Sequence, residues 1–407
     1  MERARKLLGR IVRSNRPGNV EPGPVRLIPE GPRIGRVLMS YSTRVYHDLL
    51  AGRELDRTHI SAWQNFHIAR IFLDLGFEIE VFHFEDHDFL PNGKFDVIVD
   101  IVSNLGRLGD SLGSGVIKIL FPMFAHWTVH NRNSYARHRA LAERRGVAIA
   151  PKRLLAPNDS VECADHIFCK GGHFGCSTYD YSDNPLTPIT QIHPHAINEP
   201  IDRDFEVCGK NFIWIGGSSA VHKGLDLVLE AFAELPNLNL TVLGRVTEEK
   251  KFAEVYRREL FELPNINASG WVDTLSQEFR NIVSNAAAIV APSATEMSCG
   301  SVIAGMMNGL IPITTETTDI EVAGIGRSIE TGTVPAVRNA ILEVADMTPA
   351  ELRALSHASY DASQKRYGGD KFIRSFRAAT CDALGLSPPD NWLAAENKLR
   401  IPEIEKI

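Results

Sequence analysis

Short apolar runs alternate with segments of helical period along this chain, and this alternation constrains its fold more than any other feature. Near the start, the runs Arg36–Tyr41 and Glu78–Phe84 flank Ser61–Leu75, which opens with Ser61 and Gln64 at capping-box spacing. Neighbouring parallel strands need a crossover of this kind, usually a helix. The sequence therefore predicts an α/β fold in which helices cover parallel strands.

The same alternation continues through two units, the first ending near Pro200 and the second beginning at Asn211. The remaining predicted strands are Val97–Val102, Val116–Phe121, Asp165–Lys170, Phe212–Gly216, Leu238–Gly244, Ala288–Ala291 and Ile311–Thr314. The remaining predicted helices are Asn133–Arg145, Leu225–Leu235, Thr274–Asn285, Ser301–Asn308 and one that starts at Thr348. The five prolines within 17–33 are typical of an extended linker.

Composition excludes several classes of protein. The chain has 407 residues, of which 44% are apolar and 23% charged, as in ordinary globular proteins of two or three domains. No run approaches the roughly 20 apolar residues of a membrane span. A net charge of −6 argues against nucleic acid as a partner. Six cysteines are too sparse for a disulfide scaffold, so we expect a cytoplasmic protein with reduced thiols.

The first sixteen residues differ from the rest, with six Lys and Arg side chains against Glu2 alone. Their apolar residues fall on one side of a helix: Ala4, Leu7, Leu8, Ile11 and Val12. This pattern suits a helix on an anionic membrane surface. A solvated terminus with no partner is the alternative, and it stays open.

A glycine-rich loop follows the first strand of the second unit. Gly216 and Gly217 end the strand, and Lys223 precedes the next helix. Glycines let a ligand approach the backbone closely, and a helix start with a lysine attracts anions. The loop therefore predicts a phosphate site. A tight strand–helix turn with a solvated lysine would have the same pattern.

A second loop follows the strand Ala288–Ala291. Glu296 lies at the expected carboxyl edge of the sheet, where ligands of open α/β folds bind. Ser298, Gly300 and Ser301 come next, at a helix start, and can offer donors to a phosphate or sugar. A carboxylate that only stabilises the helix dipole is the alternative for Glu296.

Together these motifs resemble retaining glycosyltransferases of family 4. The resemblance is carried over residues 211–315 by Gly217-(x)5-Lys223-Gly224-Leu225-Asp226, by Gly270-Trp-Val-Asp273, and by Pro292-Ser293-(x)2-Glu296-(x)12-Gly309-Leu310-(x)-Pro312. More loosely, Phe66–Val81 and Asn131–Val147 resemble segments of transferases from surface-polysaccharide gene clusters.

The resemblance implies a GT-B fold, with two Rossmann-like domains and an interdomain cleft. We expect a tail and linker over 1–33, an acceptor domain over 34–200, a donor domain over 201–370, and a helical segment, 371–407, packing back on the first domain. The implied reaction transfers a sugar, with retention, from a nucleotide-diphosphate sugar to a glycan or lipid-linked acceptor in polysaccharide or glycoconjugate synthesis. No metal and no cofactor beyond the nucleotide sugar are implied. We expect a cytoplasmic protein, and the basic tail allows a peripheral position at the inner membrane face.

The resemblance also assigns roles. Lys223 would stabilise the leaving diphosphate, Glu296 would hold the donor sugar, and His126 would contact the donor sugar or the acceptor. His130 takes the histidine's role if the register is shifted, and a structural role stays open for both. The predicted donor-binding set is Gly216, Gly217, Ser218, Lys223, Gly244, Val272, Glu296, Ser298, Gly300 and Ser301.

Two positions depart from the family, and both concern the donor. Ala304 stands where the family has a second glutamate for the ribose, and Ser218 where it has an arginine. A non-catalytic nucleotide-sugar-binding partner of another transferase and a GT-B sugar epimerase therefore stay open as alternatives. A dehydrogenase is disfavoured, because no G-x-G-x-x-G follows the first strand.

Cysteine and histidine gather in one short stretch: Cys163, His166, Cys169, His173 and Cys176. These are zinc-ligand types, but no close Cys-x2-Cys pair is present. A strand over Asp165–Lys170 would send alternate side chains to opposite faces. A zinc site is therefore the less favoured interpretation.

Overall fold

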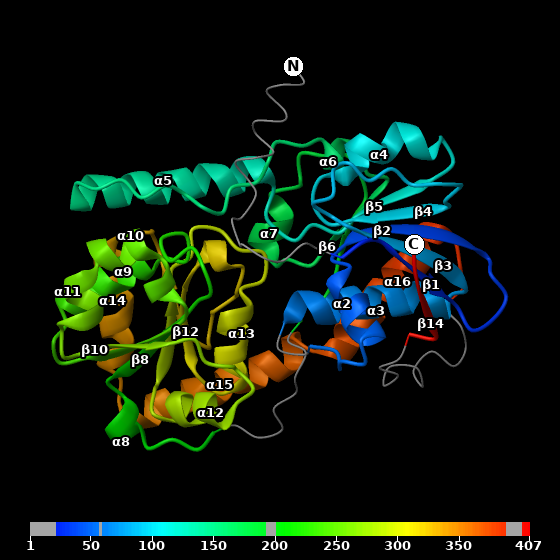
Figure 1. Ribbon diagram of the computed structural model, residues 1–407. Helices are drawn as coiled ribbons and strands as arrows, with labels where there is room; N and C mark the ends of the chain where they lie inside the picture. The colour runs from blue at the N-terminus through cyan, green and yellow to red at the C-terminus, as the bar shows by residue number, and fades with distance from the viewer. Residues whose placement is uncertain (1–21, 57–58, 193–200, 388–400) are drawn as a thin grey trace.

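Two β-sheets organise the protein and lie side by side (Figure 1). The computed structural model describes residues 22–56, 59–192, 201–387 and 401–407. The basic segment predicted to bind an anionic membrane, 1–16, lies outside these residues. Over the described part of the chain, no helix is long and apolar enough to cross a membrane.

The first sheet is mixed, with the strand order β14-β1-β3-β2-β4-β5-β6-β7. From β3 to β7 all neighbours are parallel, whereas β1 pairs antiparallel with both β3 and β14. The strands are β1 Val25–Ile28, β2 Gly35–Tyr41, β3 Phe77–His83, β4 Val97–Asp100, β5 Ile117–Leu120, β6 His166–Cys169, β7 Leu186–Pro188 and β14 Glu403–Lys406. Its helices are α2 Arg44–Leu50, α3 Ile60–Asp74, α4 Asn104–Leu112, α5 Trp127–Arg145, α6 Ser160–Cys163 and α7 His173–Ser177.

The second sheet is parallel throughout, in the order β10-β9-β8-β11-β12-β13. This is the doubly wound order of a Rossmann domain, 3-2-1-4-5-6. The strands are β8 Asn211–Ile215, β9 Asn239–Leu243, β10 Ile266–Gly270, β11 Ala288–Ala291, β12 Ile311–Thr315 and β13 Arg327–Ile329. The helices are α8 Phe205–Cys208, α9 Leu225–Ala233, η1 Val246–Glu248, α10 Lys250–Val255, α11 Arg257–Phe261, α12 Gln277–Ser284, α13 Gly300–Met307, η2 Glu316–Thr318 and α14 Val334–Ala345.

Burial on both faces explains why the strands read as continuous apolar runs. Every residue of β11 and β12 is buried, as is every residue of β4. Alternation of apolar and polar residues is expected only where one face of a sheet meets water. These runs therefore mark the central strands, and the predicted strands at these places are confirmed to within two residues at each end.

The edge of the first sheet departs from the sequence prediction. Residues Val25–Ile28 form β1 where an extended linker was expected, and Glu403–Lys406 form β14 where a helical segment was expected. The nearest prolines, Pro24 and Pro29, flank β1 without entering it, so its ladder is complete. Each strand is four residues long, and its stability comes from a partner far away in sequence, which no local pattern reveals.

Helix starts were predicted with mixed success. Thr348 and Glu351 form the expected capping box at the start of α15, Pro349–Arg366. The box expected at Ser61 and Gln64 is wrong, because α3 begins at Ile60 and buries Gln64 completely. After α15, helix α16, Gly369–Leu384, packs against α3 and β6 of the first domain.

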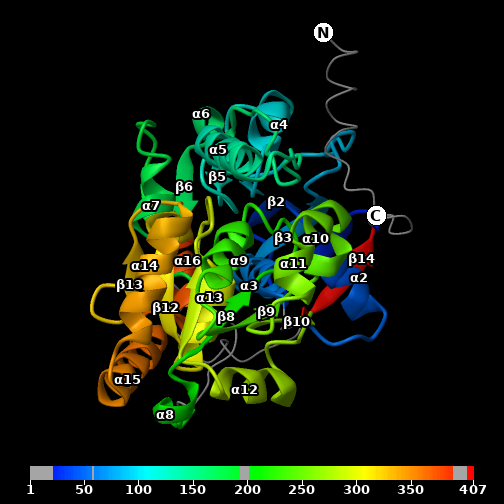
Figure 2. The ribbon, with the colours of Figure 1, turned by 90° about the vertical axis from the view of Figure 1, so that its left-hand side faces the viewer.

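Helix α5 joins the two domains. It begins at Trp127, six residues earlier than predicted, and runs over the second domain above α9 (Figures 1 and 2). Leu141 from this helix and Ile149 just after it are buried in the hydrophobic core of the second domain. The helix therefore belongs to the first domain by connectivity and to the second by packing.

Candidate functional site

The two predicted loops meet at the switch point of the second sheet. Strand order reverses between β8 and β11, which are neighbours. The glycine-rich loop follows β8, and the loop Pro292–Glu296 follows β11. Ligands of open α/β sheets bind in the crevice that such a reversal leaves at the carboxyl ends of the strands.

Glycines at the start of the first loop allow two strand ends to approach closely. A Cβ atom at Gly216 would lie 2.1 Å from the Trp214 ring, and one at Gly244 would lie 2.0 Å from the Gly216 carbonyl oxygen. Gly244 also has φ of +152°, which favours glycine. These two predicted donor-binding residues thus have a packing reason to be glycine. A Cβ at Gly217, in contrast, would meet no atom within 4 Å.

Backbone amides of the first loop are used differently from the prediction. The amides of Lys223, Gly224 and Leu225 donate to the carbonyls of residues 219–221, which closes a turn before α9. The helix start is therefore less available to an anion than expected. Gly217 and Ser218 are exposed, so the open end of the loop is the part that a ligand can approach.

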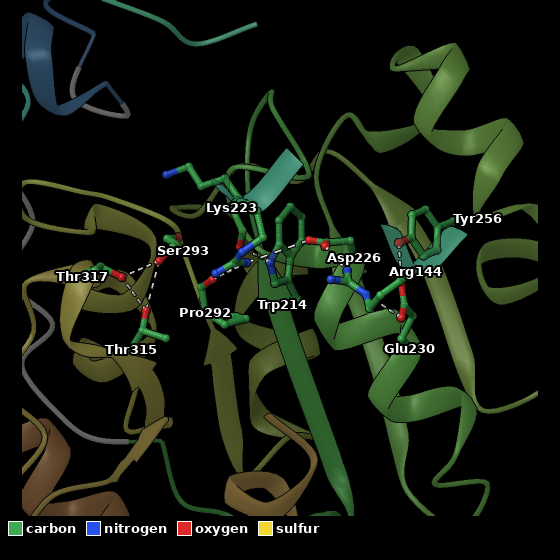
Figure 3. Close-up of polar contacts among 11 residues, drawn as sticks. Arg144, Trp214, Lys223, Asp226, Glu230, Tyr256, Pro292, Ser293, Thr315 and Thr317 are labelled. Carbon is green, nitrogen blue, oxygen red and sulfur yellow. Dashed lines mark hydrogen bonds and ion pairs between the residues drawn. The ribbon is translucent and has the colours of Figure 1, made fainter. Parts of the chain in front are cut away.

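The second loop is fastened to the end of β12. The hydroxyl groups of Thr315 and Thr317 both donate to the Ser293 carbonyl oxygen, at 3.1 and 2.6 Å (Figure 3). The Glu296 amide donates to the Thr317 carbonyl at 2.7 Å. These bonds fix the backbone on either side of the Glu296 side chain.

Hydrogen bonds also tie the two loops to each other. The His222 ring is 2.8 Å, through Nε2, from the Thr295 carbonyl, and the Ala294 amide donates to the His222 carbonyl at 2.7 Å. As a result Lys223 and Glu296 face each other, with Lys223 Nζ 2.5 Å from Glu296 Oε1. The structure brings together the two side chains on which the sequence prediction depended.

Charge keeps the Glu296 carboxylate ionised. Burial alone would raise its pKa, but the cations Lys223 and Arg153 outweigh burial and lower the pKa to about 2. Burial also lowers the pKa of His222, to about 3, so that ring is neutral near pH 7. Glu296 is therefore an acceptor of hydrogen bonds and not a proton donor.

Two cations near Glu296 were missed at the level of sequence. Arg153 lies in the loop between α5 and α6, with Nη1 3.7 Å from Glu296 Oε1. Lys170, just after β6, is buried, and its charge is felt by Glu296 and Arg153. Both belong to the first domain. Arg153 lies in a loop that gives no pattern to single it out, and Lys170 was interpreted only as the end of the predicted strand Asp165–Lys170.

The two candidate histidines lie in different surroundings. His126, at the start of α5, contacts Thr128 through Nδ1 at 2.8 Å and the Tyr181 hydroxyl through Nε2 at 3.2 Å. Tyr181 in turn donates to Glu162 at 2.7 Å. His126 also borders a small pocket in the first domain, lined largely by apolar side chains.

His130 is the histidine next to the paired loops. Its ring centre lies 4.8 Å from that of His222, and its Nε2 atom is 2.7 Å from the Arg153 carbonyl. Burial lowers the pKa of both His126 and His130, so both are neutral above their lowered pKa values. The structure thus connects His130 to the Lys223–Glu296 pair through His222, and holds His126 in a separate polar network.

The other predicted donor-binding residues lie around this pair. Ser298 adopts φ of +72°, and Ser301 lies on α13 with its Oγ atom 3.4 Å from Cys299 Sγ. A Cβ at Gly300 would lie 2.5 Å from Ile60 of α3, so the first domain covers the start of α13. Val272 packs against the core of the second domain. Ala304, in place of a ribose-binding glutamate, is buried in α13.

The cysteine and histidine cluster does not form a metal site. All six cysteines are free thiols, and Cys176 Sγ donates to the Cys169 and Gly171 carbonyls. Within residues 22–56, 59–192, 201–387 and 401–407, no three His, Cys, Asp or Glu side chains converge so as to hold a metal ion. The zinc interpretation has no support in this geometry.

Comparison with known proteins identifies a family for the segment that holds both loops. Residues 209–347 match the family model described as glycosyl transferases group 1. That segment contains both loops, Lys223 and Glu296. No curated protein sequence matches the chain.

Solved structures share the fold over most of the chain. Sucrose-phosphate synthase from Thermosynechococcus elongatus aligns with a TM-score of 0.57 at 13% identity, covering 86% of this chain and 99% of that one. Anabaena HepE, solved with UDP and glucose, aligns with a TM-score of 0.54 at 9% identity over 86% and 99%. These similarities show the GT-B fold of two Rossmann-like domains, which confirms the predicted fold class.

Proposed function

We propose that the protein is a glycosyltransferase that moves a sugar from a nucleotide-diphosphate donor to a glycan or lipid-linked acceptor. The observation that carries the proposal is the pairing of Lys223 and Glu296 at the switch point of a GT-B donor domain. The match of residues 209–347 to glycosyl transferases group 1 supports it. HepE, which shares the fold, was solved with UDP and glucose.

Lys223 stabilises the leaving diphosphate in this proposal. Its ammonium pairs with Glu296 at the switch point, and the space around Gly217 in the same loop lets a diphosphate approach the backbone. As the glycosidic bond to the diphosphate breaks, negative charge grows on the leaving oxygen. A fixed cation in a partly buried site stabilises that charge without reorganising, and so supplies the charge that other transferases draw from a metal ion.

Glu296 binds the donor sugar in this proposal. Once Lys223 turns to phosphate, the ionised carboxylate can accept hydrogen bonds from sugar hydroxyl groups. Retention of the anomeric configuration is part of the proposal and rests on the family 4 resemblance of the two loops. The proposal also includes a role in polysaccharide or glycoconjugate synthesis, which the same resemblance supports, and work in the cytoplasm, which the sparse cysteines support. His126 and His130 are its candidates for contact with the sugar or acceptor.

Turnover tests the proposal. Release of nucleoside diphosphate is measured from a panel of nucleotide sugars, with glycan and lipid-linked acceptors. Lys223→Ala and Glu296→Ala are each expected to lower kcat about 100-fold, the effect of removing one preorganised stabilising group. Lys251→Ala, an exposed lysine of the same domain, is the matched control and keeps full activity. Unchanged turnover in both site variants would falsify the assignment.

A non-catalytic binding role is the second candidate, and Ala304 favours it. The small, buried side chain cannot replace a carboxylate as a partner for ribose hydroxyls. Tight binding of a nucleotide sugar with neither transfer nor hydrolysis, across the whole acceptor panel, would support this role instead.

A further inference from the structure

Cations from the first domain gather at the Glu296 carboxylate of the second. Arg153 approaches Glu296 Oε1 from the loop after α5, and its guanidinium lies 5.4 Å from the centre of the Phe124 ring. The ring and the loop hold this side chain at the domain boundary, where 31% of it remains exposed. Arg153 is thus both oriented and within reach of a ligand.

A chain of rings supports the Arg153 backbone. The Arg153 carbonyl contacts His130, the His130 ring packs against His222, and His222 contacts the Thr295 carbonyl next to Glu296. Burial lowers the pKa of both histidines, so the two imidazole rings are neutral near pH 7. It therefore fixes Arg153 relative to Glu296 without neutralising the guanidinium.

Lys170 adds a third positive charge. It is buried between Gln64 Oε1, at 3.5 Å, and Met123 Sδ, at 3.6 Å, which are uncharged neighbours. Its ammonium interacts electrostatically with Glu296 and Arg153. Lys223, Arg153 and Lys170 therefore bring more positive charge to this place than the Glu296 carboxylate balances.

We propose that Arg153 and Lys170 bind the diphosphate of the donor together with Lys223, so that the anion site is shared between the two domains. The inference rests on the proposed function, and it extends the site to the first domain. A nucleoside diphosphate carries two to three negative charges, which match the excess of cations. Its phosphate oxygens replace Glu296 as the partner of Arg153, and Glu296 is then free to bind the sugar.

Calorimetric titration of the full chain with a panel of nucleoside diphosphates tests the proposal. Arg153→Ala is expected to weaken binding by about 10- to 100-fold, the value of one charge-assisted phosphate contact. Arg153→Lys should restore part of the affinity, because lysine keeps the charge but loses the planar fork. Arg139→Ala is the control: it removes an equal charge from an exposed position on α5 and leaves binding unchanged.

Nucleosides without phosphate separate anion binding from a structural effect. Their weaker binding should be the same in Arg153→Ala and in the parent chain, because the lost contact is to phosphate. Equal losses for nucleoside and diphosphate would overturn the proposal, since they would indicate a distorted pocket. Lys170→Met should also weaken only the diphosphate, and it provides an independent second variant.

The Lys223→Ala variant distinguishes failure of the shared anion site from failure of the proposed function. If it abolishes diphosphate binding while both Arg153→Ala and Lys170→Met bind as the parent does, the proposed function stands and the shared site is wrong. If no nucleoside diphosphate binds the parent chain, the proposed function fails and the shared site fails with it.

Discussion

At the residue scale, Lys170 is a buried cation, and the stability that its burial costs the fold can be measured. Burial lowers the pKa of Lys170 to about 8, against 10.5 for the free side chain, although Glu296 partly opposes this. Below pH 8 the Lys170 amine is protonated in both states, but the unfolded chain binds this proton more tightly than the folded chain does. Lys170 therefore destabilises the fold at pH 7, and this cost disappears as the pH rises from 8 towards 10.5.

Lys170→Met is accordingly expected to stabilise the protein at pH 7 by about 3–4 kcal/mol, because the pKa of Lys170 is lowered from 10.5 to about 8 and each pKa unit is worth about 1.4 kcal/mol. The gain should shrink steadily between pH 8 and pH 10. Urea unfolding of both chains across this range measures it. A variant less stable than the parent at pH 7 would mean that the Lys170 ammonium is well compensated in the folded state.

Residues also differ in how far the sequence could predict them. Lys223 and Glu296 were found because each belongs to a motif with fixed spacing beside a strand end. Arg153 and Lys170 have no such motif, and they reach the site only because the first domain folds against the second. In the proposed shared anion site, Arg153 of the first domain supplies the guanidinium that the family resemblance leads us to expect at Ser218 in the second.

At the scale of elements, the glycine-rich loop offers a matched pair of substitutions. Gly224 has φ of +75°, and a Cβ there would lie 2.3 Å from the Pro292 carbonyl oxygen. Gly224→Ala should therefore lower stability by about 1–3 kcal/mol and displace the Glu296 loop. Gly217→Ala meets no atom and should keep full stability, but its methyl group should hinder a ligand.

Thermal unfolding and calorimetric titration of the two variants check this expectation. Loss of binding with unchanged unfolding in Gly217→Ala, beside early unfolding in Gly224→Ala, would fit the loop as described. Equal unfolding temperatures in both variants would contradict the close approach at Gly224.

Strand prediction succeeded where burial is symmetric and failed where pairing is remote. The apolar runs of β2, β8 and β11 lie between helices and carry their own signal. In contrast, β1 depends on β14, almost 380 residues further along the chain. Early residues of α5 were missed because the helix starts at Trp127 among aromatic and histidine residues, whose helix propensity is modest.

At the scale of the whole molecule, arginines of α5 bind the helix to carboxylates of the second domain. Arg144 donates to Asp226 at 2.6 Å and to Glu230 at 3.0 Å (Figure 3). Arg145 donates to Glu230 and Glu259. Asp226 is fully buried, and desolvation raises its pKa against the pull of Arg137 and Arg144. A buried carboxylate of this kind depends on its partners.

Arg144→Ala should therefore destabilise the protein by about 3 kcal/mol, because it leaves Asp226 poorly paired. Arg139→Ala on the exposed side of α5 should change stability by less than about 0.5 kcal/mol. Urea unfolding compares them, together with Asp226→Asn and the double variant. Additive effects of Arg144→Ala and Asp226→Asn would show that the two side chains do not interact.

The antiparallel edge of the first sheet has a consequence for how the protein is made. During synthesis, β14 and α16 leave the ribosome after every strand of the second sheet has already emerged. The first sheet, which begins to form first, is thus completed last. Until β14 pairs with it, the edge of β1 is exposed and can pair with other chains. We expect chaperones that attend the nascent chain to concentrate on this half of the molecule.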